Sequence, residues 1–220
     1  MGEIRTIGIV GAGKLGITLA RIARHYGFDV NIAGSGEPKK IALTAEVLAP
    51  GTVAMTTEEV AAKSDVIVLA LPLGKFRTLP KQAFKDKLVI DAMNHWWEVD
   101  GERSAIVPDD VSSSEAVQEY LAGARVVKAF NHIGYHDLFD EHKPRDAQDR
   151  KSIAVAGNDS DDVRMVSELI DELGFDPLVI GNLQEGSRLE PGMNTFGASV
   201  TREQLKALLA KQHTYEKSAA

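Results

Sequence analysis

A six-residue glycine pattern near the N-terminus has the residue types and spacing of a turn that binds phosphate groups. The pattern G-x-G-x-x-G is formed by Gly11, Ala12, Gly13, Lys14, Leu15 and Gly16. It follows an apolar run and opens a segment with helical periodicity, which is the context that the motif requires. The first glycine then permits a tight turn, the second lets the backbone approach a pyrophosphate, and the third lets the helix pack on a sheet. Free N–H groups at the helix N-terminus would bind the phosphates, and the alternative is a glycine turn without a ligand.

The residues after the second expected strand indicate which dinucleotide this turn would bind. Enzymes that use NAD usually place Asp or Glu there to bind the ribose 2′-hydroxyl. This chain has Ala33 and Gly34 instead, followed by Ser35 and two lysines, Lys39 and Lys40. A hydroxyl with two nearby cations suits a 2′-phosphate, so the sequence predicts NADP(H) in preference to NAD(H). In the alternative interpretation Ser35 caps a helix and the lysines are only solvated.

Three segments at expected strand ends are candidates for the reaction site. They are 71–75, 93–97 and 130–132, and they include Leu71 and Pro72. Hydride transfer between two rings needs mainly positioning, so it requires no side-chain nucleophile. A carbonyl or imine substrate would need a proton donor, for which the candidates are His132 and His95, with Asn94 beside them. A structural role for either histidine stays open.

The turn at 93–97 also contains both tryptophans of the chain, Trp96 and Trp97. They have the shape to stack on a flat substrate, or they belong to the core or to an interface.

The order of apolar runs and helical segments predicts how these residues are positioned. Several runs are apolar on both faces, as parallel strands covered by helices are. Their alternation with helical patterns predicts an α/β fold of the Rossmann type, a doubly wound and mostly parallel sheet with a short C-terminal extension. The expected strands are Ile4–Val10, Asp29–Ala33, Thr52–Met55, Val66–Leu71, Leu88–Asp91, Ala124–Ala129, Ile153–Ala156 and Pro177–Ile180.

Helix signals lie between these runs. Apolar residues in Lys14–His25 follow one helical face. Capping boxes begin at Thr56 and Ser112, and Asn158–Asp162 supplies caps for a helix that extends to Leu173. We therefore expect a dinucleotide-binding domain over residues 1–182. A tail over 183–220 would end in a helix at about Glu203–Lys211, and we expect it to close over the active site or to pack on a second subunit as a homodimer.

Composition excludes several other classes of function. The 220 residues carry a net charge of −7, without the basic footprint of a nucleic-acid-binding protein. There is no cysteine, so thiolate chemistry and cysteine-bound metals are excluded. No metal site is expected, because the spacing of His132 and His136 is interrupted by Gly134. The longest apolar stretch is far shorter than the about 20 residues of a membrane span, and no signal peptide is recognisable, so a cytoplasmic location is expected.

Four sequence segments together resemble one enzyme family. They are A-G-S-G-E-P-K-K, A-L-P-L-G, R-V-V-K-A-F-N-H and V-I-G-N-L-Q-E-G-S-R-L-E. With the glycine pattern, over roughly residues 4–197, they resemble the NADPH-dependent deazaflavin (coenzyme F420) reductases, a family similar to the NADPH domain of the six-transmembrane metalloreductases. The resemblance implies that Gly11–Gly16 wrap the pyrophosphate and that Ser35 and Lys39 meet the 2′-phosphate, with Lys40 as a neighbouring candidate. It also implies that Leu71 and Pro72 pass beside the adenosine or nicotinamide ribose.

The function expected from these features is an NADP(H)-dependent oxidoreductase. The resemblance implies hydride transfer between the nicotinamide and a deazaflavin, a flavin or a similar small acceptor. Two alternatives remain: an NADP(H)-binding sensor or regulatory protein without turnover, and a reductase for a small carbonyl or imine.

Overall fold

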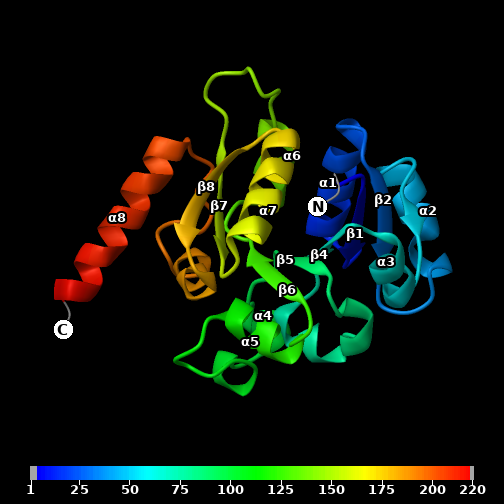
Figure 1. The fold of residues 1–220 in the computed structure, drawn as a ribbon, viewed down its shortest axis with the longest axis horizontal. Helices are drawn as coiled ribbons and strands as arrows, with labels where there is room; N and C mark the ends of the chain where they lie inside the picture. The colour runs from blue at the N-terminus through cyan, green and yellow to red at the C-terminus, as the bar shows by residue number, and fades with distance from the viewer. Residues whose placement is uncertain (1–3, 219–220) are drawn as a thin grey trace.

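The computed structural model describes residues 4–218 and places eight strands in one sheet, in the order β3-β2-β1-β4-β5-β6-β7-β8 (Figure 1). Strands β1–β6 are parallel to one another, β7 is antiparallel to β6, and β8 is parallel to β7. The predicted α/β class and mostly parallel sheet are confirmed. Residues 1–3, on which the expectation of no signal peptide partly depends, lie outside the described residues.

All eight predicted strands are present, most of them with shifted ends. The strands are β1 Thr6–Val10, β2 Asp29–Ala33, β3 Val53–Ala54, β4 Val66–Leu69, β5 Leu88–Asp91, β6 Arg125–Lys128, β7 Ser152–Gly157 and β8 Asp176–Gly181. The central strands β4 and β5 are buried at every position, as expected for parallel strands with helices on both faces. Strand β4 ends at Leu69, so Leu71 and Pro72 lie beyond the sheet, in the loop where ligands bind in such folds.

The helices cover both faces of the sheet. The α-helices are α1 Lys14–His25, α2 Lys39–Leu48, α3 Thr57–Lys63, α4 Trp97–Asp100, α5 Ser113–Tyr120, α6 Tyr135–Glu141, α7 Ser160–Glu172 and α8 Arg202–Ser218. Short 3₁₀-helices are η1 Leu73–Thr78, η2 Lys81–Phe84, η3 Arg103–Ala105 and η4 Leu183–Leu189. Buried side chains of α1, α6 and α7 pack on one face, and those of α3, α5 and η1 pack on the other. This two-sided packing is the doubly wound arrangement.

The helix caps explain where several helices begin. Thr56 and Ser112 each accept a bond from the backbone N–H three residues on, and Glu59 and Glu115 return the bond, which confirms both predicted capping boxes. The alternative interpretation, in which Ser35 caps a helix, is wrong. Helix α2 begins at Lys39 with Pro38 at its N-cap and no side-chain cap, so the Ser35 hydroxyl is not used there.

The C-terminal segment packs beyond the last strand. Strand β8 ends at Gly181, next to the expected boundary at residue 182. Leu205 and Leu209 of α8 are buried against Ala154 of β7 and Leu178 of β8, which places α8 at the edge of the sheet (Figure 1). Helix α8 is longer than the predicted Glu203–Lys211. Within residues 4–218, no helix has the length and apolarity to cross a membrane.

Candidate functional site

The three glycines after β1 have three different surroundings. An added Cβ would lie 2.2 Å from the Ala70 carbonyl oxygen at Gly11, whose φ of +123° also favours glycine. At Gly16 an added Cβ would lie 1.8 Å from the Gly11 oxygen. At Gly13 it would meet nothing within 4 Å, because that position faces open space at the start of α1. The first and third glycines are therefore needed for packing, whereas the second leaves room for a ligand.

Helix α1 presents a free N-terminus at this open space. Gly13 is its N-cap and supplies no side-chain cap, and there is no acidic residue in the first turn. Unpaired N–H groups and the positive end of the helix dipole at such a position favour an anionic group. A pyrophosphate matches this environment in charge, and the open space at Gly13 leaves room for it.

Two pockets lie on either side of the glycine turn. The sheet order reverses between β1 and β4, where ligands bind in open α/β sheets. The pockets, of about 700 Å³ and 490 Å³, share a divide formed by Gly13, Ala70, Leu71 and Pro72. The larger is called the outer pocket below and the smaller the inner pocket. Their arrangement matches an extended ligand that crosses the turn.

The outer pocket contains the residues expected to choose between cofactors. Ser35, Gly36, Thr57 and Lys75 line it. A Cβ added at Gly36 would lie 3.5 Å from Lys40 Nζ, so the Lys40 ammonium is close to the pocket floor. Lys39, by contrast, is strongly exposed, and its Nζ forms an ion pair with Glu37 at 2.6 Å. Of the two predicted lysines, Lys40 therefore has the better position for a 2′-phosphate.

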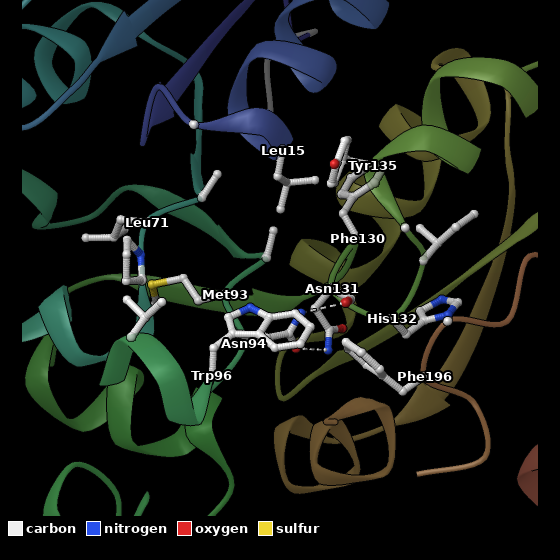
Figure 2. Close-up of a pocket in the computed structure, with 18 residues that line it drawn as sticks. Leu15, Leu71, Met93, Asn94, Trp96, Phe130, Asn131, His132, Tyr135 and Phe196 are labelled. Atoms are coloured by element: carbon white, nitrogen blue, oxygen red, sulfur yellow. Dashed lines mark hydrogen bonds between the residues drawn. The ribbon is translucent and has the colours of Figure 1, made fainter. Parts of the chain in front are cut away.

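The inner pocket is mainly apolar and is built from distant segments (Figure 2). Leu15 of α1, Met93 after β5, and Phe130 after β6 line it. Trp96 and Phe196 meet edge to face across it, with ring centroids 5.7 Å apart. The sequence predicted that the three strand ends would converge and that the tail would close over the active site or pack on a second subunit. Phe196 and Gly197 of the tail line this pocket together with the strand ends.

Asn94 and Asn131 form a reciprocal amide pair in this pocket. Asn94 donates from Nδ2 to the Asn131 carbonyl oxygen at 2.7 Å, and Asn131 donates from Nδ2 to Asn94 Oδ1 at 3.1 Å (Figure 2). Asn131 Nδ2 also donates to the Leu189 carbonyl oxygen at 2.8 Å. Asn94, a candidate catalytic residue from the sequence, thus holds the ends of β5 and β6 together.

The two candidate histidines have structural partners. His132 is fully buried, and its Nε2 accepts a hydrogen bond from the Ala154 N–H of β7 at 3.0 Å. Burial lowers the pKa of His132 to about 4. The bond to Ala154 gives His132 Nε2 a structural role, and the low pKa does not favour a protonated ring near neutral pH. His132 also borders the inner pocket, and its role as a proton donor stays a prediction. His95 Nε2 lies 2.7 Å from the Gly101 carbonyl oxygen and fixes the loop around α4.

The depressed pKa of His132 predicts a loss of stability in acid. Below pH 6.5 the unfolded chain takes up a proton at this residue, whereas the folded chain stays neutral until about pH 4. Stability is therefore complete above pH 6.5 and declines as the pH falls towards 4, by roughly 3 kcal/mol from this residue. Urea unfolding at about pH 7 and about pH 4.5 should show a smaller decline in His132→Gln than in the parent chain. Equal declines in both proteins would contradict this assignment.

A buried ion pair below the inner pocket was not anticipated from the sequence. Lys128 of β6 and Asp91 of β5 are both fully buried, with Nζ and Oδ2 3.2 Å apart. Asp91 also accepts from the Ser114 hydroxyl at 2.6 Å and from the Met93 N–H at 2.9 Å. Lys128 donates to the Met93 carbonyl oxygen at 2.7 Å. The pair thereby fixes the backbone of Met93, which lines the pocket.

His132 and His136 do not share a helix, because α6 begins at Tyr135 with Gly134 as its N-cap. The two histidines therefore do not form the i, i+4 pair of a helical metal site. In the described part of the chain, no three His, Asp or Glu side chains gather as a metal site would require.

Comparison with known proteins agrees with the geometry of the glycine turn. Residues 6–95 match the family model described as NADP oxidoreductase, coenzyme F420-dependent. The F420-dependent NADP reductase of Methanocaldococcus jannaschii is 28% identical over 145 residues, which are 63% of each chain. The metalloreductase STEAP3 of Rattus norvegicus is 29% identical over 191 residues, which are 86% of this chain and 36% of that protein. The chain thus spans less than two thirds of the length of either relative.

A solved structure supports the whole fold. The hypothetical protein SMa0349 from Sinorhizobium meliloti has a TM-score of 0.76 and 28% identity, with 90% of this chain and 96% of that chain covered. Together these matches confirm the predicted resemblance to the coenzyme F420-dependent NADP oxidoreductase family.

Proposed function

We propose that this chain, whose residues 6–95 match the coenzyme F420-dependent NADP oxidoreductases, is itself an NADP(H)-dependent oxidoreductase that transfers hydride to a flat acceptor. The observation that carries the proposal is the open space at Gly13, which leads to a pocket on each side of the turn. The cytoplasmic location and the homodimer expected from the sequence stay predictions.

The residues of the groove fit NADP(H). The start of α1 and the Gly13 backbone would hold the pyrophosphate, and Ser35 with Lys40 would hold the 2′-phosphate in the outer pocket. The end of β2 bears no carboxylate that would repel this phosphate, since Ala33, Gly34 and Ser35 follow one another there. Leu71 and Pro72, at the divide between the pockets, would lie against the ribose on the nicotinamide side.

When bound, the cofactor would supply a hydride from its nicotinamide ring to an acceptor in the inner pocket. The protein would contribute positioning: Leu15, Met93 and Phe130 form apolar walls that hold two rings close together and exclude water. The buried network of Asp91 and Lys128 keeps Met93 in place. Because a ring-to-ring hydride transfer needs no side-chain acid, the structural roles of His132 and His95 are compatible with this activity.

The first experiment measures NADPH and NADH binding and then follows nicotinamide absorbance after addition of a deazaflavin or a flavin. Tight NADPH binding with loss of absorbance would support the reductase. Tight binding with no loss across the acceptors would favour the sensor without turnover. Loss of absorbance only with carbonyls or imines would favour a reductase for a small carbonyl or imine.

Lys40 is predicted to set the preference for NADPH. Lys40→Ala should weaken NADPH binding about tenfold and leave NADH binding unchanged, because only NADPH carries the 2′-phosphate. Lys39→Ala is the matched control, since Lys39 is already paired with Glu37. Isothermal titration of both cofactors with both variants would test this. A larger effect for Lys39→Ala than for Lys40→Ala would contradict the assignment.

A further inference from the structure

The inner pocket is free of charged side chains. Within the described part of the chain, none of the residues that line it is Lys, Arg, Asp or Glu. Its polar side chains are uncharged amides and one histidine: Asn94 and Asn131 bond to each other, and His132 Nε2 bonds to Ala154. Asn131 Oδ1 and His132 Nδ1 are buried without a hydrogen-bond partner, and neither atom carries a positive charge that would balance an anion. A buried ionic group without a partner is strongly disfavoured. An anionic group in this pocket would therefore have no counter-charge.

The charges that border this pocket also disfavour anions. Helix α4, whose Val99 lines the pocket, carries Glu98 and Asp100 on the same turn. Lys14 lies beside the lining, with its Nζ 5.4 Å from the centroid of the Tyr135 ring. Lys14 belongs to the glycine turn, where the pyrophosphate would use its charge. No cationic side chain therefore remains in the lining for an anionic acceptor.

The two tryptophans have separate positions. Trp96 lines the pocket, is 46% exposed and packs edge to face with Phe196 (Figure 2). Trp97 begins α4, is 63% exposed and is not part of the lining. An aromatic pair with one partly exposed face is suited to stacking on a planar ring. Of the two tryptophans, only Trp96 is placed to do so.

We propose that the acceptor is an uncharged planar ring compound that binds against Trp96 and Phe196, and that anionic derivatives of the same ring bind poorly. This inference rests on the proposed function. The hydride, with its electron pair, forms the new bond to the acceptor ring while the C–H bond of the nicotinamide breaks. NADPH is oxidised to NADP⁺, the acceptor is reduced, and a proton from water neutralises the reduced ring.

Riboflavin and FMN provide a matched test, because they share one ring system and differ by a terminal phosphate. Equilibrium dialysis would measure the Kd of each flavin with and without saturating NADP⁺. We expect riboflavin to bind at least about tenfold more tightly than FMN. Trp96→Ala should weaken riboflavin binding by about tenfold, whereas Trp97→Ala should leave it unchanged. Thermal unfolding of both variants would show that each is folded.

Fluorescence gives a second readout, because Trp96 and Trp97 are the only tryptophans of the chain. In Trp97→Phe the remaining emission comes from Trp96, and riboflavin should quench it. FMN binding as tight as that of riboflavin, binding of neither flavin, or equal effects of Trp96→Ala and Trp97→Ala would each overturn the inference. A failure of NADPH to bind would instead overturn the proposed function, while the dialysis without cofactor still tests the pocket.

Discussion

Replacement of Gly13 by valine should abolish NADPH binding and leave the fold intact. The backbone at Gly13 is extended, with φ −83° and ψ −169°, which a β-branched residue adopts readily. The added side chain would extend into the open space in front of α1 that the pyrophosphate would occupy. We expect the affinity for NADPH to fall at least about 100-fold, or about 2.7 kcal/mol, in isothermal titration. The free energy of unfolding should change by less than about 0.5 kcal/mol.

Gly16 provides the control for this experiment. A Cβ at Gly16 would lie 1.8 Å from the Gly11 oxygen, so Gly16→Ala should destabilise the protein itself. The two glycines of one motif thus separate a loss of binding from a loss of fold. Unchanged NADPH affinity in Gly13→Val would show that the phosphates do not approach this turn.

The sequence could predict the fold because its signals are local. Apolar runs such as Val66–Leu69 and Leu88–Asp91 are buried on both faces, and that burial requires a continuous apolar pattern. The capping boxes at Thr56 and Ser112 each need only four consecutive residues. The loop after β2 was less predictable. Pro38 stands at the N-cap of α2 without a side-chain bond, and the sequence alone left a cap at Ser35 open as an alternative.

The inner pocket was harder to predict because its contacts join distant parts of the chain. Trp96 meets Phe196, about one hundred positions later in the sequence, and no local pattern encodes that contact. His132 could be recognised as a histidine at a strand end, but its burial and its bond to Ala154 depend on the position of β7. Residue type alone therefore could not show that His132 Nε2 accepts a hydrogen bond from the backbone of a distant strand.

The Asp91–Lys128 pair also joins residues that are distant in the sequence, and its loss should have a large effect on stability. A charged residue at the end of an apolar strand usually reaches solvent, and no local pattern indicated that these two would be buried together. Lys128→Met should destabilise the protein by about 3–5 kcal/mol, because it leaves the Asp91 carboxylate buried without its counter-ion. It also removes the bond to the Met93 carbonyl oxygen. Urea unfolding near neutral pH would measure the loss.

A double variant separates buried charge from lost packing. In Asp91→Asn with Lys128→Met no ionised group remains, and the new amide can still accept from the Met93 N–H and donate to the Ser114 hydroxyl. The double variant should therefore be more stable than Lys128→Met alone, although it carries one more substitution. If the stability losses of Lys128→Met and Asp91→Asn simply add in the double variant, the unpaired buried charge is not the cause of the destabilisation. If they do not, the pair is a matched unit that holds Met93, and with it one wall of the inner pocket.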